Sequence, residues 1–293
     1  MLSTQEARQP HSYMRSLRRR PFDAAGLALL VATLALAVLV PLIAPHDPSA
    51  QDATRRLLPP GTSGHFLGTD HLGRDVFSRM LHGLRLSVIV GMGAVALGGV
   101  GGGLLGLVSA TAKHRFGRLD MLIQRALDAV MAFPIVVLAL GVVVAFGASV
   151  TSVVWALALA YAPLAARVTR AAALAERSRP YVEAARALGA SETRVAWQHI
   201  APACLSPWLV LVSAEVGAAM LAESALSFLG LGAQEPQASL GGMLGGAALP
   251  YLEQAPWLAL WPGVALCVAV LAFNLSGDAL RDALDPHTLR GFP

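Results

Sequence analysis

Residues Pro180–Pro207 read PYVEAARALGASETRVAWQHIAPACLSP, a polar, arginine-bearing stretch between two long apolar runs. The pattern predicts a short helix over 181–188, a break at Gly189 and a second helix over 192–200. The two prolines near the end of the stretch should stop this second helix before the next apolar run. Insertion of such a polar element into lipid is costly, so it should lie in water. We therefore expect residues 180–207 to be a handle by which a soluble partner grips a membrane protein.

The composition of the chain indicates a membrane protein. Of its 293 residues, 55% are hydrophobic and 14% are charged, whereas soluble domains contain roughly 25% charged residues. The net charge is +4, and the basic residues cluster beside apolar runs, which indicates membrane orientation rather than nucleic-acid binding. Cys204 and Cys267 form no CxxC motif, and we interpret them as small hydrophobic residues.

The apolar runs predict the fold class, an all-α membrane protein with six transmembrane helices, because a helix of about 20 residues crosses a bilayer. The first run, over 24–44, is too long for the apolar core of a cleaved signal peptide. The others lie over 86–112, over 129–166, over 208–229 and over 258–277, and the 129–166 run has 38 residues, which fits two spans with a turn near Gly147.

The distribution of basic residues orients these spans. The segments expected in the cytoplasm carry 17 basic residues and those expected outside carry 5, so both termini should be cytoplasmic. The predicted organisation is a cytoplasmic tail over 1–21, a transmembrane helix over 22–44, an external loop over 45–85 and a core over 86–293, which includes the 180–207 loop and ends in a cytoplasmic tail over 278–293.

Glycines in the second span follow the GxxxG spacing. Gly98 and Gly102, Gly99 and Gly103, and Gly102 and Gly106 all fit it. Small residues at this spacing let membrane helices approach closely, so we expect this span to pack tightly against its neighbours. A phosphate-binding loop is excluded, because no Lys-Ser/Thr pair follows the glycines.

The fifth and sixth spans contain polar side chains that lipid would disfavour. Glu215, Glu223 and Ser227 lie in the fifth span, and Asn274 lies near the end of the sixth. Ionisable groups within a membrane usually face a bundle interior or an aqueous cavity. These residues are therefore candidates for a transport path, and a hydrogen bond from a glutamate to a neighbouring helix is an equally open interpretation.

The external loop contains the motif LGTDHLGRDVFSR over 67–79. Thr69 or Asp70 could cap a short helix, and Asp70 and Arg74 have the i,i+4 spacing of an ion pair. The motif predicts either an amphipathic surface helix or, through Asp70, Arg74 and Asp75, a face for an external partner. The loop histidines, His65, His71 and His82, match no common metal-site spacing, so we expect no metal site.

Catalytic motifs are missing from the sequence. The only lysine, Lys113, follows Ala-Thr-Ala rather than the glycine of a nucleotide-binding loop, and the chain contains neither HExxH nor GxSxG. We therefore expect no enzyme activity. The remaining interpretations are a membrane conduit that takes its energy from another subunit and a membrane scaffold that transports nothing.

Residues 180–207 resemble the EAA loop of permease subunits of bacterial ATP-binding-cassette (ABC) importers. Glu183, Ala184, Ala185, Gly189 and Pro202 match the family pattern, whereas Ala201 stands where the pattern has leucine. Three further stretches resemble the second permease subunit of the dipeptide, oligopeptide and nickel branch. They are LGTDHLGRDVFSR (67–79), AESALSFLGLG (222–232), and APWLALWPG (255–263) together with LAFNLSGDALRDALDP (271–286).

The resemblance implies an ABC type I importer permease fold in the bacterial inner membrane. It also implies a heterodimer with a homologous permease subunit, two cytoplasmic ATPase subunits that bind ATP and Mg, and a periplasmic solute-binding protein. This chain would contact lipid, bind no nucleic acid and hold no cofactor of its own. In the family the EAA loop lodges in a groove of the ATPase. Carried over, Glu183 would make a polar contact there, Ala184 and Ala185 would allow close approach, and Gly189 would form the turn.

The resemblance leaves the solute open. Peptides are the commonest cargo of this branch, and nickel, metallophores, glutathione and haem are rarer. Solute choice is expected mainly in the binding protein, so the pore itself should be permissive.

Overall fold

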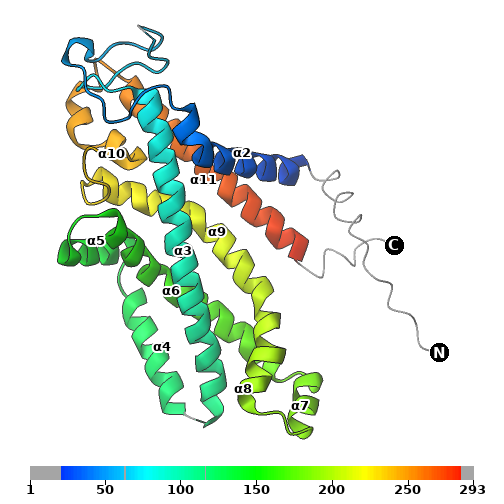
Figure 1. The fold of residues 1–293 in the computed structure, drawn as a ribbon. Coiled ribbons are helices and arrows are strands. Elements are labelled where there is room, and N and C mark those ends of the chain that lie inside the picture. The colour runs from blue at the N-terminus through cyan, green and yellow to red at the C-terminus, as the bar shows by residue number, and fades with distance from the viewer. Residues whose placement is uncertain (1–20, 63, 116, 285–293) are drawn as a thin grey trace.

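The computed structural model describes residues 21–62, 64–115 and 117–284. Of the predicted 1–21 tail only Pro21 is described, and the predicted 278–293 tail is described only as far as residue 284. The helices, labelled as in Figure 1, are α2 (Pro21–Ile43), α3 (Val76–Arg115), α4 (Gly117–Met131), α5 (Ile135–Phe146), α6 (Val150–Arg177), α7 (Pro180–Ala187), α8 (Glu192–Val195), α9 (Ala201–Phe228), α10 (Leu240–Leu244) and α11 (Trp257–Leu284).

The described residues contain five helical segments long and apolar enough to cross a membrane, and a sixth crossing if the bent pair α4–α5 counts as one span. The five are Ala24–Ile43, Val76–Thr111, Val150–Arg177, Glu192–Phe228 and Trp257–Leu284. The structure is thus all-helical across its described part, apart from loops and two isolated β-bridges. This confirms the predicted fold class.

In place of a single third span in the first half of the 129–166 run, the structure has α5 within that run and α4 mostly before it. α4 and α5 meet at a bend of 92°, and Pro134 is the N-cap residue of α5. Proline disfavours helical backbone in the residue before it, which accounts for the break between Met131 and Ile135. The predicted turn near Gly147 is confirmed, because Gly147 has φ +91° and Ser149 caps the start of α6.

The prediction that Pro202 and Pro207 stop the second helix of the 180–207 stretch is wrong. α8, a π-helical segment over Ala196–Ile200 and α9 form one continuous span from Glu192 to Phe228. Pro202 follows the π-helical segment within this continuous helix, where its missing N–H removes one backbone hydrogen bond. The π-helical segment directly before it is the kind of local widening that lets a helix continue past such a position.

The loop predicted over 45–85 ends earlier in the structure, because α3 already begins at Val76. Asp75 caps this helix, since its Oδ2 accepts a hydrogen bond of 2.8 Å from the Ser78 N–H. No helix begins at Thr69 or Asp70. Asp70 instead accepts hydrogen bonds from the backbone of Leu72 and Arg74 in a turn.

α3 is the central helix of the molecule and packs along both α6 and α9 (Figure 1). Glycines make this closeness possible, as the GxxxG spacing predicted. A Cβ atom at Gly98, Gly102 or Gly106 would collide with the carbonyl oxygen of Ala158, Ala162 or Ala166 on α6. On another side of α3, the Trp208 indole of α9 donates a hydrogen bond of 2.8 Å to the Gly99 carbonyl.

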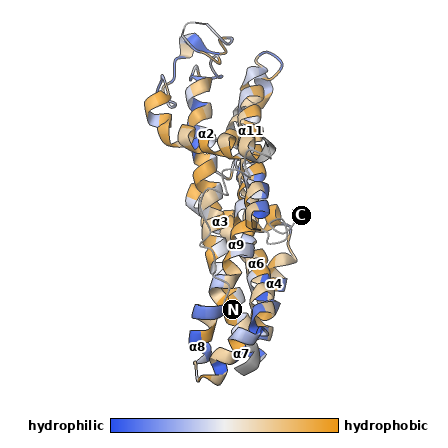
Figure 2. Cartoon of the chain, turned by 90° about the vertical axis from the view of Figure 1, so that its right-hand side faces the viewer, coloured by the Kyte–Doolittle hydropathy of each residue, from blue (hydrophilic) through white to orange (hydrophobic). Residues whose placement is uncertain are grey.

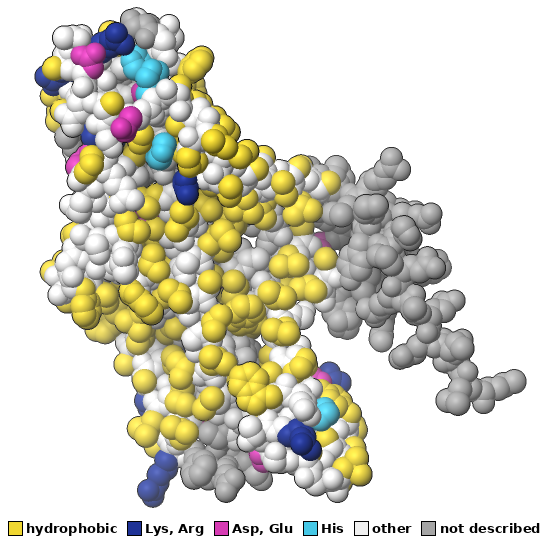
Figure 3. Space-filling view, in the orientation of Figure 1, with side chains coloured by type: hydrophobic (Ala, Val, Ile, Leu, Met, Phe, Trp, Pro, Cys, Tyr) yellow, Lys and Arg dark blue, Asp and Glu magenta, His cyan; other side chains and the backbone are white. Residues whose placement is uncertain are grey.

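The two ends of the molecule are polar. The loop after α2 lies at one end with α10, and α7 and α8 lie at the opposite end (Figure 1). In Figure 2 the middle parts of α2, α3 and α9 are largely hydrophobic, and polar residues gather around α4, α7 and α8. Figure 3 likewise shows charged and histidine side chains at both ends with a mostly hydrophobic surface between them. This is the pattern of a membrane-spanning bundle.

Candidate coupling hairpin and external cap

Residues Pro180–Ile200 form a compact helical hairpin, which we call the coupling hairpin. Pro180 begins α7, a position where its missing N–H costs nothing. Gly189 follows with φ +86°, a left-handed conformation that glycine adopts without steric cost. Ser191 then caps α8 by accepting a hydrogen bond from the Arg194 N–H. The predicted helix–glycine–helix element is confirmed.

Apolar contacts fix the hairpin to the bundle. Val182 of α7 and Val195 of α8 are both completely buried. They share a cluster with Leu107 of α3 and Ala173 of α6. The hairpin therefore rests on the ends of two long helices rather than projecting freely into solvent.

Ion pairs and hydrogen bonds add to this attachment. The Arg186 guanidinium donates to Glu192 across the hairpin at 2.9 Å. Arg177, at the end of α6, lies 3.8 Å from the same carboxylate and donates a hydrogen bond of 2.9 Å to the Ala110 carbonyl of α3. These contacts thus tie the hairpin to both α3 and α6.

The outer surface of the hairpin carries most of the residues that match the EAA pattern. Glu183, Ala184 and Gly189 are exposed together, and beside them Leu188 is 89% exposed. Ala185 is half-buried and packs against the cluster beneath. Pro202 lies beyond the hairpin, in α9. Leu188 matches no residue of the EAA pattern, and only the structure shows how exposed it is.

The opposite end of the molecule, residues 44–75 and 230–256, forms what we call the external cap. Within it Arg74 is 2% exposed, and its guanidinium contacts Asp70 at 2.6 Å and Glu235 at 2.5 Å. Arg79 contacts the same Glu235 carboxylate at 3.3 Å. This network ties the 67–79 motif to the loop between α9 and α10.

The predicted contact-face residues of the 67–79 motif are not on the surface. Asp70, Arg74 and Asp75 are all buried, because they satisfy one another, the cap backbone and Glu235. The predicted Asp70–Arg74 ion pair does form, but within a turn rather than on a helix. These residues therefore shape the cap, and its exposed side chains include Phe66 and Glu235.

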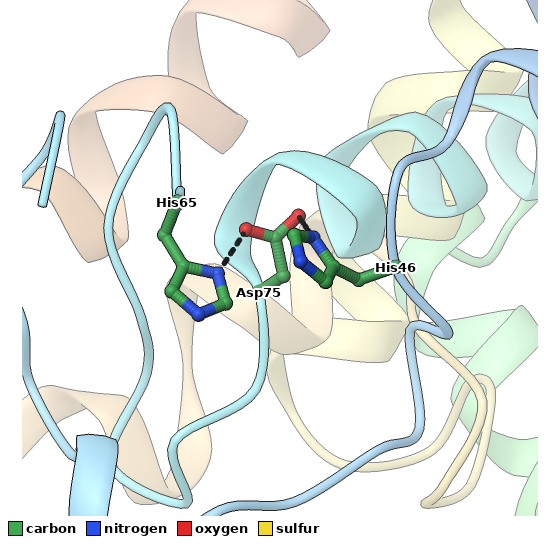
Figure 4. Close-up of side chains that lie close together, drawn as sticks. All are labelled: His46, His65 and Asp75. Atoms are coloured by element: carbon green, nitrogen blue, oxygen red, sulfur yellow. Dashed lines mark hydrogen bonds and ion pairs between the residues drawn. The ribbon is translucent and has the colours of Figure 1, made fainter. Parts of the chain in front are cut away.

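His46, His65 and Asp75 come together in the cap (Figure 4). Nδ1 of His65 lies 2.8 Å from Oδ1 of Asp75, and Nδ1 of His46 lies 3.7 Å from Oδ2 of the same carboxylate. The sequence prediction of no metal site rested on His65, His71 and His82 and did not include this group. Its members are 19 and 10 residues apart along the chain, a spacing that carries no motif.

The candidate transport-path residues do not form one group. Glu223 is 2% exposed and accepts hydrogen bonds from Ser87 at 2.6 Å and from Ser227 at 2.7 Å. Glu215 is half-buried two turns earlier on α9. Asn274 of α11 lies against Gly217 of α9. Glu223 is therefore hydrogen-bonded to a neighbouring helix, which was one of the two interpretations of a glutamate in this span. A transport role for the four residues stays a prediction.

Comparison with known proteins identifies close relatives over almost the full chain. A putative peptide transport system permease protein of Brucella suis is 42% identical over 93% of this chain and 90% of its own. The di/tripeptide transport system permease protein DppC of Pseudomonas aeruginosa is 40% identical over 89% of this chain and 86% of its own. The glutathione transport system permease protein GsiD of Pectobacterium atrosepticum is 39% identical over 94% and 89%.

A chain of the MetNI methionine ABC transporter, solved in inward-facing conformations, has a similar fold. The TM-score is 0.58 at 16% identity, over 71% of this chain and 97% of that one. Residues 11–60 match the N-terminal transmembrane domain of oligopeptide transport permease C. Residues 102–290 match the binding-protein-dependent transport system inner membrane component. Since this match covers more than half of the chain, the protein belongs to that family, as a multi-pass permease subunit of an ABC importer and not itself a catalyst.

Proposed function

We propose that this chain pairs with a homologous permease subunit in the bacterial inner membrane and imports short peptides. Two ATPase subunits, which bind ATP and Mg²⁺ themselves, dock on the coupling hairpin, and this chain holds no cofactor. A solute-binding protein delivers the peptide at the external cap. Both termini lie in the cytoplasm, on the same side as the hairpin.

The geometry of the coupling hairpin carries this proposal. Its outer face presents Glu183, Ala184 and Leu188 to solvent, while Val182 beneath is fully buried. The small side chain of Ala184 lets a partner approach the backbone of α7, and Leu188 supplies apolar area that a groove in the partner would bury. An exposed surface with both a charged and an apolar side chain that is also fixed to the bundle by buried contacts suits the transfer of mechanical force.

The mechanism follows from what the hairpin touches. Closure of the ATPases on ATP moves the hairpin, and the contacts of Val182 and Arg177 carry that movement to α3 and α6. These helices tilt with the rest of the bundle and open the path outward, and ATP hydrolysis resets it. Such rocking of helical bundles around a central path is a known form of alternating access.

Relatives named for peptide and for glutathione transport support a short peptide as the cargo. Glutathione is a tripeptide and is the second candidate. Because solute choice should rest mainly on the binding protein, exchanging that protein should change the transported solute more than substituting Glu215 or Glu223 does. Competition uptake assays in reconstituted vesicles measure how far solute preference changes after each kind of replacement. A larger change from the glutamate substitutions than from the exchanged binding protein would show that the path itself selects the solute.

Gly189→Val tests the coupling role. Valine is strained at the φ of +86° of Gly189, so the turn should distort, and uptake and copurification with the ATPases should both fall. Glu183→Lys should also abolish uptake while leaving membrane insertion intact. Gly61→Val is the matched control, because Gly61 has φ +80° and open space around it but lies in the external cap.

The control should retain ATPase copurification, because its strain is at the opposite end. Normal uptake by both Gly189→Val and Glu183→Lys would refute the coupling role. A chain that never copurifies with an ATPase would instead support a membrane scaffold without transport.

A further inference from the structure

The external cap brings together two imidazole rings and one carboxylate from three separate segments. His46 follows the end of α2, His65 lies in the loop, and Asp75 caps α3 (Figure 4). One ligand atom from each lies within 4.8 Å of the other two, and within the described residues no other such group was found. The rings of His46 and His65 are 4.7 Å apart and tilted by 32°. We propose that these three residues bind a divalent transition-metal ion such as Zn²⁺.

The distances are close to those of a coordinated ion. Donor atoms about 2.0–2.1 Å from Zn²⁺ in tetrahedral geometry are about 3.3 Å apart. His65 Nδ1 lies 2.8 Å from Oδ1 of Asp75 and His46 Nδ1 lies 3.7 Å from Oδ2 of the same carboxylate, and one ligand atom from each residue lies within 4.8 Å of the other two. The three donors therefore reach an ion between them through side-chain adjustments of an ångström or so, without any change in the fold of the cap.

The donor chemistry selects the class of ion. Two imidazole nitrogens and one carboxylate oxygen suit Zn²⁺, Cu²⁺ or Ni²⁺, whereas Ca²⁺ and Mg²⁺ prefer oxygen donors alone. Three protein ligands leave a fourth position for water. The ion would take the place of the hydrogen between His65 Nδ1 and Asp75, and the His65 ring stays neutral because its proton is then carried by Nε2.

The surroundings hold the ligands in place and give access to solvent. Ser78 is fully buried. Its N–H donates to Oδ2 of Asp75, and its hydroxyl accepts from the His46 N–H at 3.2 Å. One residue thus positions two of the three ligands, as outer-sphere partners do in metal sites. The side chains of Asp75 and His65 are 1% and 7% exposed, whereas that of His46 is 40% exposed and leaves the ion a route in.

A bound ion would fasten the end of α2 and the cap loop to the start of α3. The site lies at the opposite end of the molecule from the coupling hairpin (Figure 1), so its role is to stabilise the cap rather than to couple ATP hydrolysis. This inference does not depend on which solute is transported.

Direct metal binding tests the proposal. The full chain, purified in detergent with an affinity tag that contains no histidine, is stripped with a chelator. It is then titrated with Zn²⁺ in competition with a chromophoric chelator. We expect one tight equivalent in the wild type and at least about tenfold weaker binding in His46→Gln and in His65→Gln. His46→Gln is the main variant, because His46 is partly exposed and its replacement should leave the fold intact.

His71→Gln is the matched control, since His71 lies in the same cap but outside the cluster. It should bind Zn²⁺ as the wild type does. Zn²⁺ should also raise the unfolding temperature of the wild type and of His71→Gln, but not that of His46→Gln. Wild-type affinity no higher than that of His46→Gln would overturn the proposal, and so would tight binding that survives both cluster substitutions.

Discussion

Glu223 on α9 and Ser87 on α3 are joined by a hydrogen bond of 2.6 Å, although 136 residues separate them along the chain. The same carboxylate also accepts hydrogen bonds from Ser224 and Ser227. Glu223 is therefore one of the polar links between two long helices inside the bundle, where lipid offers no alternative partner.

Replacing Glu223 should separate its structural role from a transport role. Glu223→Ala leaves buried serine hydroxyls without their acceptor, which should cost about 1–3 kcal/mol of unfolding free energy. Glu223→Gln keeps the size and an acceptor oxygen, so it should cost less. Denaturant unfolding of the purified protein measures both. Wild-type stability of both variants together with lost uptake would favour the transport role instead.

The close packing of α3 on α6 predicts a position-specific effect of glycine substitution. Gly102→Val places methyl groups against the Ala162 backbone, and overpacking of this kind should cost about 1–3 kcal/mol or more. Gly101 is the control, because nothing lies within 4 Å of a Cβ atom there. Thermal unfolding should show a lower midpoint for Gly102→Val than for Gly101→Val. Equal midpoints would mean that the two helices are not in close contact.

The exposed leucine of the coupling hairpin predicts where the ATPase docks. Leu188 is 89% exposed, and Leu188→Asp would place a charge in the apolar interface that we propose, which is costly without a partner. Copurification with the ATPase subunits should fall at least about tenfold, while the permease itself stays folded. Phe66→Asp alters a similarly exposed apolar residue of the external cap and should leave ATPase binding unchanged. Equal effects of the two variants would remove Leu188 from the docking surface.

His71 predicts a pH dependence of cap stability. Its ring stacks on Tyr251 at 5.7 Å, and burial lowers the pKa of His71 below its ordinary value of 6.5. As pH falls through about 6.5, the unfolded chain takes up this proton before the folded chain does. Acidification therefore destabilises the fold. The stability that neutral His71 contributes is fully present above about pH 6.5 and is lost as the pH falls towards the lower pKa of His71 in the folded protein.

His71→Phe keeps an aromatic ring but removes the titration. Between about pH 7.5 and about pH 5.5, the wild type should lose more thermal stability than this variant. The difference between the two isolates His71 from the other histidines, which both proteins retain. Parallel pH profiles would show that His71 contributes nothing to the acid sensitivity.

Local patterns predicted much of the architecture correctly. Gly189 adopts the left-handed turn expected between two short helices, and Gly147 marks the turn between α5 and α6. The spacing of Gly98, Gly102 and Gly106 indicated a close helix contact and is confirmed against α6. Each of these features depends on the backbone freedom or small size of a residue and its nearest neighbours, which sequence displays directly.

Other features depended on neighbours distant in the chain. The proline before α5 bends a span by 92°, yet the helix from Glu192 continues past Pro202. The same residue type thus had opposite outcomes in two packing environments. Asp70 and Arg74 look like surface residues in sequence, but Glu235, 161 residues after Arg74, completes a buried network with them.

The sequence by itself determined the membrane location, the approximate positions of the spans and the helix–glycine–helix form of the coupling hairpin. Hydrophobicity and backbone propensity act over a few residues and need no knowledge of distant partners. Only the tertiary structure decided that Glu223 joins α3 to α9 and that His46, His65 and Asp75 lie together in the external cap. Such groups form when separate segments pack together, and long-range packing is the part of folding that local pattern does not contain.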